Sequence, residues 1–290
     1  MSADERRTSV AVLGAGLIGI DLVDKIQRSR HLELRLVVGR RRESLGLARA
    51  AALGCPTTSG GISSLLEAGS FDVVFDASNA DVHAGHWAAL RDSGTTLIDL
   101  TPTQLGTFIV PTVNGDQAAA HRHINLVSCG GQAAIPLLHA LAQHCTPSYI
   151  EVVSTGASAS AGRATRLNLD QYIATTQAAI RYFTHAPDVK VMVNLSPARP
   201  APPFRVVMTV LAADLNPGLT RAAVTSAAEE VRAFTPGFAV TSLDARDGRA
   251  SVAVEVTATG GRIPKYAGNL DIINGAALLF AEQHAAAPSR

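Results

Sequence analysis

A cysteine followed by two glycines stands out in this sequence as a candidate nucleophile. Cys129 ends an apolar run, and Gly130, Gly131 and a helix-like segment come after it. A helix N-terminus stabilises a thiolate, and small residues leave backbone amides free to bind a developing oxyanion. We therefore predict nucleophilic catalysis at Cys129. The alternative is an ordinary buried cysteine, which is our interpretation of Cys55 and Cys145.

Three glycines form a second pattern with chemical meaning. Gly14, Gly16 and Gly19 lie in the string GAGLIG, between an apolar β-rich run and a segment with helical spacing. In that context the glycines permit a tight turn, close approach of the backbone to a pyrophosphate, and close packing of the helix on the strand. The helix N-terminus adds amide donors and a positive dipole. The pattern favours dinucleotide binding over a glycine set that only packs a helix.

The residues that read the ribose of a dinucleotide are expected at the end of the second strand. Glu33 is an acidic residue at about the expected sequence distance, but it lies at the beginning of that strand. The strand ends instead at Gly39, and Arg40 and Arg41 follow. Arginine suits the 2′-phosphate of NADP, so the sequence slightly favours NADP over NAD. The alternative is a pair of solvated surface arginines.

A polar segment, Ser160–Asn168, precedes an amphipathic helix predicted over Leu169–Thr184. Its Ser, Thr, Arg and Asn side chains suit phosphate or amide binding, although the same residues also cap helices. The nine histidines show no metal-ligand spacing. We therefore predict no metal site.

The elements that position these residues change character near Ser128. Strands and helices alternate before it, which predicts a Rossmann-type, doubly wound parallel sheet. The predicted strands of this half are 9–13, 32–38, 71–75 and 95–99, and its helices include 45–53 and 82–90. Longer alternating strands follow, which predict an α+β domain with an antiparallel or mixed sheet. These strands are 149–153, 189–193, 204–211 and 250–257, with a helix over 220–234 and an ordered loop at the prolines of 197–203.

Length and composition limit the class of protein. A chain of 290 residues with 47% apolar residues is long enough for a nucleotide-binding domain and a second domain. A net charge of +1 gives no electrostatic bias toward nucleic acid. Three cysteines do not form a disulfide framework and fit a reducing compartment, and neither a signal peptide nor a membrane-length apolar run is found. We expect a cytoplasmic protein that binds neither nucleic acid nor a membrane.

Seven strings in the sequence resemble the acylating acetaldehyde dehydrogenases that partner 4-hydroxy-2-oxovalerate aldolases in catechol meta-cleavage, a route of aromatic hydrocarbon catabolism. The similarity runs from about Val10 to Ala277. The strings are GAGLIGIDLV, FDASNADVH, LIDLTP, VPTVN, NLVSCGGQAAIP, SAGRATRLNLDQY and PKYAGNLDI. The resemblance implies a dinucleotide-binding domain over 1–128, a catalytic and dimerisation domain over 129–268, and a C-terminal helix within 269–290 that returns to the first domain. It also implies a homodimer and an aldolase partner.

The resemblance assigns roles residue by residue. Cys129 matches the nucleophile that carries the acyl thioester, and Gly130 and Asn168 are implied as oxyanion donors. The matching nucleotide contacts are Gly14, Ala15, Gly16, Leu17, Ile18, Gly19, Ser78, Ser160, Ala161, Gly162, Arg163, Ala164, Thr165, Arg166, Leu167, Asn168 and Asn269.

The sequence departs from the family pattern at three positions. Leu17 replaces the usual asparagine of the glycine turn, and Arg40 replaces the aspartate that commonly follows the second strand. The family also has an aspartate, proposed to assist catalysis, where this chain has Val206. The first two departures leave the choice between NAD and NADP open. The third predicts another source of activation for Cys129, a bulkier or more apolar acyl substrate, or an altered acceptor.

The reaction implied is the reversible conversion of a short-chain aldehyde, coenzyme A and NAD or NADP to an acyl-CoA and the reduced dinucleotide. Two alternatives stay open. One is a phosphorylating semialdehyde dehydrogenase, which shares the Rossmann fold and the nucleophilic cysteine. The other is a weakened nucleotide-binding subunit of an aldolase complex, against which the presence of Cys129 argues.

Overall fold

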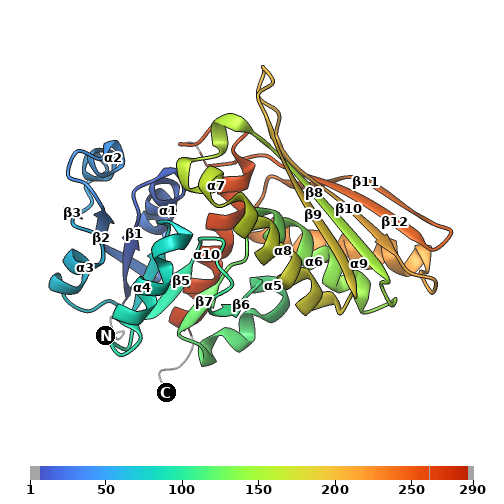
Figure 1. The fold of residues 1–290 in the computed structure, drawn as a ribbon, viewed down its shortest axis with the longest axis horizontal. Coiled ribbons are helices and arrows are strands. Elements are labelled where there is room, and N and C mark those ends of the chain that lie inside the picture. Colours follow the sequence, from blue (N-terminus) through green and yellow to red (C-terminus); the bar gives the residue numbers. More distant parts are fainter. Residues whose placement is uncertain (1–6, 261, 287–290) are drawn as a thin grey trace, which may run out of the picture.

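The structure is a computed structural model that describes residues 7–260 and 262–286. Two β-sheets, each with its own helices, lie side by side, and a long C-terminal helix runs between them (Figure 1). Among the described residues, none of the helices combines the length and apolar composition needed to cross a bilayer.

The first sheet confirms the predicted doubly wound parallel architecture. Its strand order is β3-β2-β1-β4-β5-β7-β6, and every neighbouring pair is parallel. The strands are β1 (Thr8–Leu13), β2 (Leu32–Gly39), β3 (Thr57–Ser59), β4 (Val73–Asp76), β5 (Thr96–Asp99), β6 (Thr107–Phe108) and β7 (His123–Asn125). The strand order reverses at β1, because the chain adds β2 on one side of it and β4 on the other.

Helices cover both faces of this sheet. Alternate residues of β1 point to opposite faces, and each face has its own apolar core. Val10 and Val12 pack with α1 (Leu17–Arg28), α2 (Leu45–Ala52) and α10 (Gly268–Ala286). Ala11 and Leu13 pack with α3 (Ile62–Glu67) and α4 (Ala80–Leu90). Burial on both faces explains the continuous apolar runs in β1 and β4.

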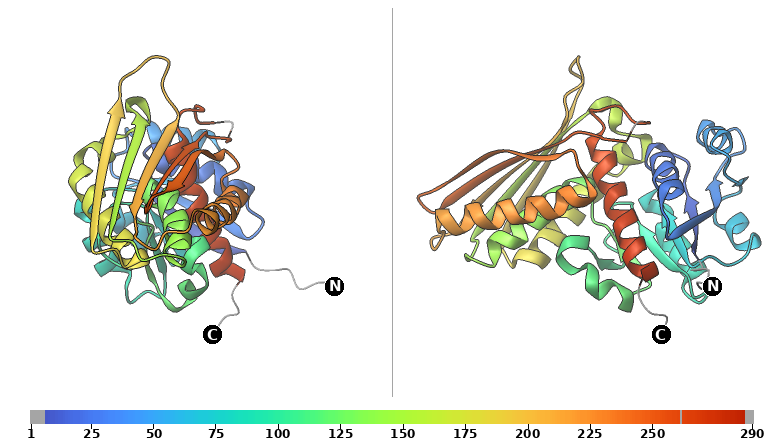
Figure 2. Two further views of the ribbon diagram at one scale, coloured as in Figure 1. Left: turned by 90° about the vertical axis from the view of Figure 1, so that its right-hand side faces the viewer. Right: turned by 180° about the vertical axis from the view of Figure 1, so that it is seen from behind.

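The second sheet is mixed and carries helices on one face (Figure 2). Its order is β11-β12-β10-β8-β9, antiparallel except for the β8–β9 pair. The strands are β8 (Tyr149–Ala157), β9 (Asp188–Ser196), β10 (Phe204–Leu211), β11 (Phe238–Arg246) and β12 (Arg249–Val256). The helices α6 (Cys129–Ala142), α8 (Leu169–Thr184) and α9 (Pro217–Phe234) form the layer that packs on it.

A buried ionic cluster joins α10 to α1. Lys25 Nζ lies 2.6 Å from Asp21 Oδ2 and 2.8 Å from Asp271 Oδ1. The side-chain amide of Asn274 donates to the carbonyl oxygen of Ile18 at 3.0 Å and to Asp21 Oδ2 at 2.8 Å. The helix that begins at the glycine turn is therefore held in place by the last helix of the chain.

Most predicted elements are present with small changes in their ends. The predicted helix over 169–184 and strand over 204–211 match α8 and β10, and α9 begins three residues early because Asn216 caps it and Pro217 occupies its first turn. Strand β11 was not predicted, because its edge position lets polar residues interrupt the apolar alternation. The remaining short elements are α5 (Pro111–Asn114), α7 (Arg163–Leu167) and the 3-10 turns 115–120 and 158–160.

Candidate active site

Cys129 is the first residue of α6, directly beyond the carboxyl end of β7. The hydroxyl of Ser128 caps this helix by accepting a hydrogen bond from the amide of Gly131 at 2.9 Å. Cys129 is half-buried and packs against the cores of both sheets, whereas Cys55 and Cys145 are buried. Of the three cysteines, Cys129 alone is partly exposed.

Tyr172, from α8, brings a hydroxyl group to this cysteine. Its Oη lies 3.4 Å from Cys129 Sγ and accepts a hydrogen bond from the amide of Gly130 at 2.8 Å. The amide that the sequence analysis assigned to an oxyanion is therefore already engaged by a phenol. Sequence reasoning missed Tyr172 because it lies 43 residues from Cys129 and no local pattern pairs them.

The protonation of the two groups follows from their burial. Burial raises the pKa of the Cys129 thiol, although hydrogen bonds from Tyr172 and the Gly130 amide oppose this effect. Burial and the neighbouring sulfur also raise the pKa of Tyr172 well above its ordinary value. The helix position alone suggested a stabilised thiolate. In the structure, desolvation by burial opposes that thiolate and outweighs the hydrogen bonds, so the pKa of the thiol is raised.

The glycine turn has the geometry that dinucleotide binding requires. Gly14 has φ of +114°, and a Cβ there would lie 2.5 Å from the carbonyl oxygen of Ala77. A Cβ on Gly19 would lie 1.9 Å from the carbonyl oxygen of Gly14, so this position packs α1 closely on β1. A Cβ on Gly16 would meet no atom within 4 Å. Gly16 is thus the open position, and Ala15, Leu17 and Ile18 complete the turn.

The segment 160–168 lies beside the glycine turn. A Cβ on Gly162 would be 3.9 Å from Leu17 Cδ1. The Asn168 amide donates to Asn79 Oδ1 at 2.5 Å, which ties the segment to the loop after β4, and the Asn269 amide donates to the carbonyl oxygen of Ser160 at 3.4 Å. Within the segment, Ala161 and Asn168 are buried, Thr165 is half-buried, Ala164 lies in α7, and Arg163, Arg166 and Leu167 are exposed.

Three buried oxygen atoms in this region have no hydrogen-bond partner among the described residues. They are Ser154 Oγ, Asn168 Oδ1 and Asn269 Oδ1. Burying a polar atom without a partner costs free energy of folding, so each of these atoms has hydrogen-bond capacity left for a further group.

The two arginines after β2 are exposed. Arg40 and Arg41 follow Gly39, the last residue of the strand next to β1, and among residues 7–260 and 262–286 neither forms an ion pair. Glu33 lies at the other end of β2, where it pairs with Ser9 of β1. The positions relative to the sheet are thus those expected from the sequence.

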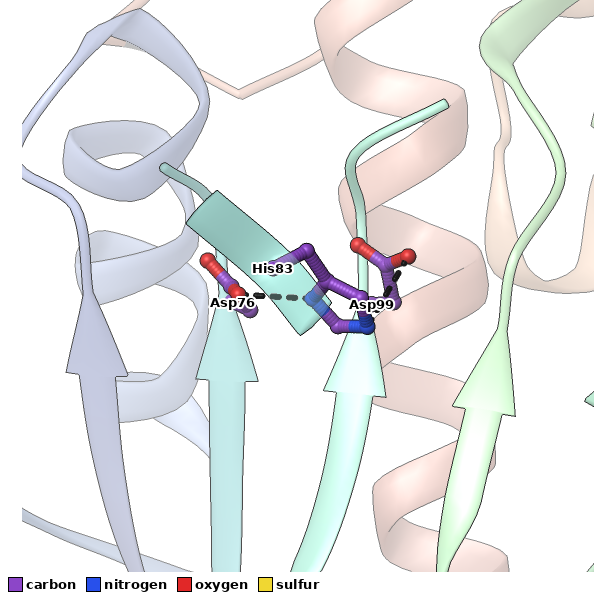
Figure 3. A group of neighbouring side chains, drawn as sticks. All are labelled: Asp76, His83 and Asp99. Carbon is purple, nitrogen blue, oxygen red and sulfur yellow. Dashed lines mark hydrogen bonds and ion pairs between the residues drawn. The ribbon is translucent and has the colours of Figure 1, made fainter. Parts of the chain in front are cut away.

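A buried cluster of carboxylates and imidazoles, which the sequence analysis missed, lies at the carboxyl ends of β4 and β5. His83 of α4 lies between Asp76 and Asp99, the last residues of these strands (Figure 3). Its Nδ1 is 2.7 Å from Asp76 Oδ2, and its Nε2 is 3.3 Å from Asp99 Oδ2 and 2.8 Å from His123 Nε2. The Nδ1 atom of His86 also lies 2.7 Å from Asp76 Oδ2.

The side chains of this cluster shift one another's pKa values through hydrogen bonds and charge, against the effect of burial. Burial opposes ionisation of Asp76, but the hydrogen bonds of His83 and His86 outweigh it and lower the pKa of Asp76. Burial likewise opposes protonation of His83, but the two carboxylates raise its pKa. Burial raises the pKa of Asp99 to about 7. These shifts favour an ion pair between an ionised Asp76 and a protonated His83.

Asp76, His83 and Asp99 are also residue types that bind metal ions, and their ligand atoms lie within 4.8 Å of one another. A metal site needs several lone pairs directed at one shared centre. Here the imidazole ring itself lies between the carboxylates, and both of its nitrogens are engaged. We therefore interpret the cluster as an ion-pair network.

The network connects the two ends of the candidate site. Asp76 Oδ1 accepts hydrogen bonds from the amide and hydroxyl of Ser78, one of the predicted nucleotide contacts, at 3.1 and 2.5 Å. On the other side, Asp99 Oδ2 accepts from the Asn125 amide at 3.3 Å, and Asn125 Oδ1 accepts from the amide of Val127 at 2.7 Å. Val127 has φ of 63°, which is strained for a β-branched residue, and it precedes Ser128 and Cys129.

Val206 lies in the buried face of β10, opposite Ser154 of β8. A Cβ on Gly130 would be 2.4 Å from both Ser154 Oγ and Tyr172 Oη, so β8 borders the cysteine site through Ser154. Val206 lies on β10, the strand next to β8. The side chain at 206 belongs to the apolar core. No carboxylate reaches the cysteine from this position.

Comparison with known proteins gives a consistent assignment. Residues 129–264 match the family model described as "Prokaryotic acetaldehyde dehydrogenase, dimerisation". The acetaldehyde dehydrogenase of Streptomyces griseus subsp. griseus is 51% identical over 282 residues, covering 97% of this chain and 92% of that protein. That of Burkholderia thailandensis is 40% identical over 292 residues, covering 99% and 98%.

A solved structure shows the same fold at low sequence identity. The crystal structure of aspartate semialdehyde dehydrogenase II complexed with ASA from Vibrio cholerae is 12% identical, with a TM-score of 0.66 over 96% of this chain and 98% of that one. At this identity the similarity concerns the fold alone. The sequence relatives, in contrast, match nearly the whole chain, and on that ground this protein belongs to the acetaldehyde dehydrogenase family.

Proposed function

We propose that this protein is a CoA-acylating aldehyde dehydrogenase that forms an acyl thioester on Cys129. The observation that carries the proposal is a partly exposed cysteine at a helix N-terminus, at the same edge of the parallel sheet as the glycine turn. Parallel sheets bind ligands beyond the carboxyl ends of their strands, where the strand order reverses. A thiol and a dinucleotide at one such edge suit a redox reaction on a covalently held substrate.

The residues at this edge fit a dinucleotide. The open position of Gly16 lets a pyrophosphate approach the N-terminus of α1, whose first turn has no acidic residue to repel it. The unpartnered oxygens of Asn168 and Asn269 are acceptors for ligand hydroxyl or amide groups. We assign the glycine turn, Ser78, the 160–168 segment and Asn269 to dinucleotide binding.

The chain's own groups account for the acylation half-reaction. The sulfur of Cys129 bonds to the carbonyl carbon of the aldehyde, and the π-electron pair of the carbonyl moves to its oxygen. A hydrogen-bond donor that faces this oxygen stabilises the tetrahedral adduct. Nicotinamide, when bound, supplies the acceptor for the hydride that leaves the former aldehyde carbon. The product left on the protein is a thioester of Cys129, and the proton of the original thiol is released to solvent.

The second half-reaction is a transfer between two sulfur atoms. The thiol of coenzyme A attacks the thioester carbon, and the bond from that carbon to the sulfur of Cys129 breaks. The proton of the coenzyme A thiol returns Cys129 to its free thiol form. If coenzyme A and the dinucleotide use one entrance, the reduced dinucleotide leaves first, and we expect ping-pong kinetics. The reverse sequence reduces an acyl-CoA to an aldehyde.

An assay of the purified protein tests this function. A panel of short-chain aldehydes is crossed with NAD or NADP, and with coenzyme A, phosphate or neither. We expect reduction of the dinucleotide that depends on coenzyme A. Turnover that requires phosphate and ignores coenzyme A would select the phosphorylating alternative. Absence of turnover in every arm would contradict the enzymatic proposal.

We propose that Arg40 and Arg41 favour NADP by binding its 2′-phosphate. Replacing both by alanine is expected to lower kcat/KM for NADP by at least about 10-fold, because hydrogen bonds to charged groups are worth about 1.5–3 kcal/mol. The value for NAD is expected to stay nearly constant. Arg49→Ala, an exposed change on α2, is the matched control. Equal losses with NAD and NADP would rule out this role.

We propose a homodimer formed through the second sheet. The match to a dimerisation model covers 129–264, and the helices α6, α8 and α9 form a layer on one face of that sheet (Figure 2).

We keep the division into 1–128, 129–268 and 269–290 as the proposed domain boundaries, and an aldolase as the proposed partner subunit. Light scattering tests the dimer, and co-purification with the aldolase tests the complex.

A further inference from the structure

Tyr172 is the side chain that contacts the sulfur of Cys129. Among the described residues, its hydroxyl is the side-chain group within hydrogen-bond distance of Sγ, at 3.4 Å. The residue is 7% exposed and projects from α8, whose backbone continues directly from Asn168. A buried tyrosine hydroxyl needs a hydrogen-bond donor for its oxygen and an acceptor for its proton. The identity of these partners determines whether the hydroxyl can transfer a proton.

The hydrogen-bond capacity of the hydroxyl leaves one direction open. A phenol oxygen offers two acceptor positions and one O–H donor. The amide of Gly130 fills one acceptor position at 2.8 Å, and the thiol of Cys129 fills the second when it donates. The O–H can then donate to a third group; the hydroxyls of Ser154 and Ser128 lie next to Oη, and a ligand acceptor competes with them for this proton. A substrate carbonyl oxygen, whose carbon lies against Sγ, is such an acceptor.

From this geometry, and resting on the proposed function, we infer that Tyr172 transfers the proton during addition of Cys129 to the aldehyde. The S–C bond forms as the π pair of the carbonyl moves to oxygen. Tyr172 gives its hydroxyl proton to that oxygen and receives the thiol proton from sulfur. The phenol is regenerated, and the product is a neutral hemithioacetal. No other reactant is consumed.

The surroundings favour this route over one through separated charges. Burial holds both the thiol and the phenol in their neutral forms, so a thiolate or a phenolate at this position is costly. When the thiol proton passes to Tyr172 while Tyr172 gives its own proton to the carbonyl oxygen, a proton relay, no free thiolate or phenolate forms, and that cost is avoided. The Gly130 amide, which donates to Oη, makes the O–H more acidic and therefore a better donor.

The relay also explains how the site works with valine at position 206. Val206 is fully buried and apolar, and it pairs with Ser154, whose Oγ lies near Tyr172. A carboxylate base is therefore replaced by a hydroxyl from a different element, α8. The role of Tyr172 is catalytic, because its oxygen touches the reacting sulfur.

The test uses Tyr172→Phe, which keeps the ring and removes the hydroxyl. We expect the single-turnover rate of dinucleotide reduction to fall by about 10²–10⁴-fold, the usual effect of losing a proton-transfer group. We also expect the pH profile of Cys129 alkylation by iodoacetamide to move to higher pH, because the thiolate loses a hydrogen-bond donor. Tyr182→Phe makes the same chemical change on α8 at a 55% exposed position and serves as the control.

A rate within about threefold of the unmodified protein would overturn the inference. If the unmodified protein is active, that result leaves the proposed function intact; an unmodified protein that is itself inactive contradicts the function instead. If Tyr172→Phe does not fold, fluorotyrosine at position 172 keeps the shape and makes the hydroxyl more acidic. The alkaline fall in rate is then expected at lower pH, and an unmoved profile would also overturn the inference.

Discussion

Replacement of Cys129 by serine is expected to lower CoA-dependent aldehyde oxidation by at least about 10⁴-fold, as happens when a covalent nucleophile is removed. Serine keeps the size of the side chain, but its hydroxyl is a far weaker nucleophile than a thiol. The measurement is the rate of dinucleotide reduction with saturating aldehyde and coenzyme A. Mass spectrometry after mixing with substrate should find the acyl group on residue 129 of the unmodified protein and none on the variant.

The other cysteines provide the controls for this experiment. Cys55 and Cys145 are buried, and the thiol of Cys145 donates to the carbonyl oxygen of Leu141 at 3.4 Å. Cys145→Ser is expected to keep most of the activity. Dinucleotide binding, followed by fluorescence titration, should survive in Cys129→Ser because the glycine turn is separate from the sulfur. An active Cys129→Ser protein would show that no thioester is formed.

Replacement of Asp76 by alanine is expected to lower the free energy of unfolding by about 3–5 kcal/mol, the usual cost of leaving one member of a buried ion pair alone. His83 is then left with a single carboxylate, Asp99, and His86 loses its partner. Ser78 also loses the oxygen that holds its amide and hydroxyl. Urea denaturation measures the change, and weaker dinucleotide binding should accompany it.

The size of this effect is expected to depend on pH. The pKa of Asp76 is lowered, so its contribution exists above the ordinary aspartate value of about 3.9 and is lost as the pH falls. The pKa of His83 is raised, so its contribution is complete below the ordinary histidine value of about 6.5 and is lost as the pH rises further. The cost of Asp76→Ala is therefore greatest between about pH 4 and 6.5.

Asp92→Ala is the matched control for Asp76→Ala. The side chain of Asp92 is 89% exposed and pairs with Arg91 at 3.3 Å, so its removal is expected to change stability by less than about 0.5 kcal/mol. A pH-independent cost of Asp76→Ala would show that packing, and not the charge pair with His83, sets its contribution.

Local patterns in the sequence were sufficient to predict the architecture. The apolar runs of β1 and β4 and the helical spacing of α1 are determined by neighbours a few residues apart, so they can be read from the sequence. The same holds for the glycine turn, because a positive φ at Gly14 and close packing at Gly19 leave glycine as the residue that fits. The position of Cys129 at the start of a helix was also predictable, because its glycines and the following helix are adjacent in sequence.

The surroundings of that cysteine depend on contacts that no local pattern encodes. Tyr172 reaches Cys129 because α8 packs beside α6, and Asp99 reaches His83 because β5 lies next to β4. The neutral state of the thiol is also a tertiary property, since it depends on how much water the surrounding elements exclude. Sequence spacing sets backbone conformation over one turn or strand, but burial and the approach of distant side chains are determined only when the elements pack together.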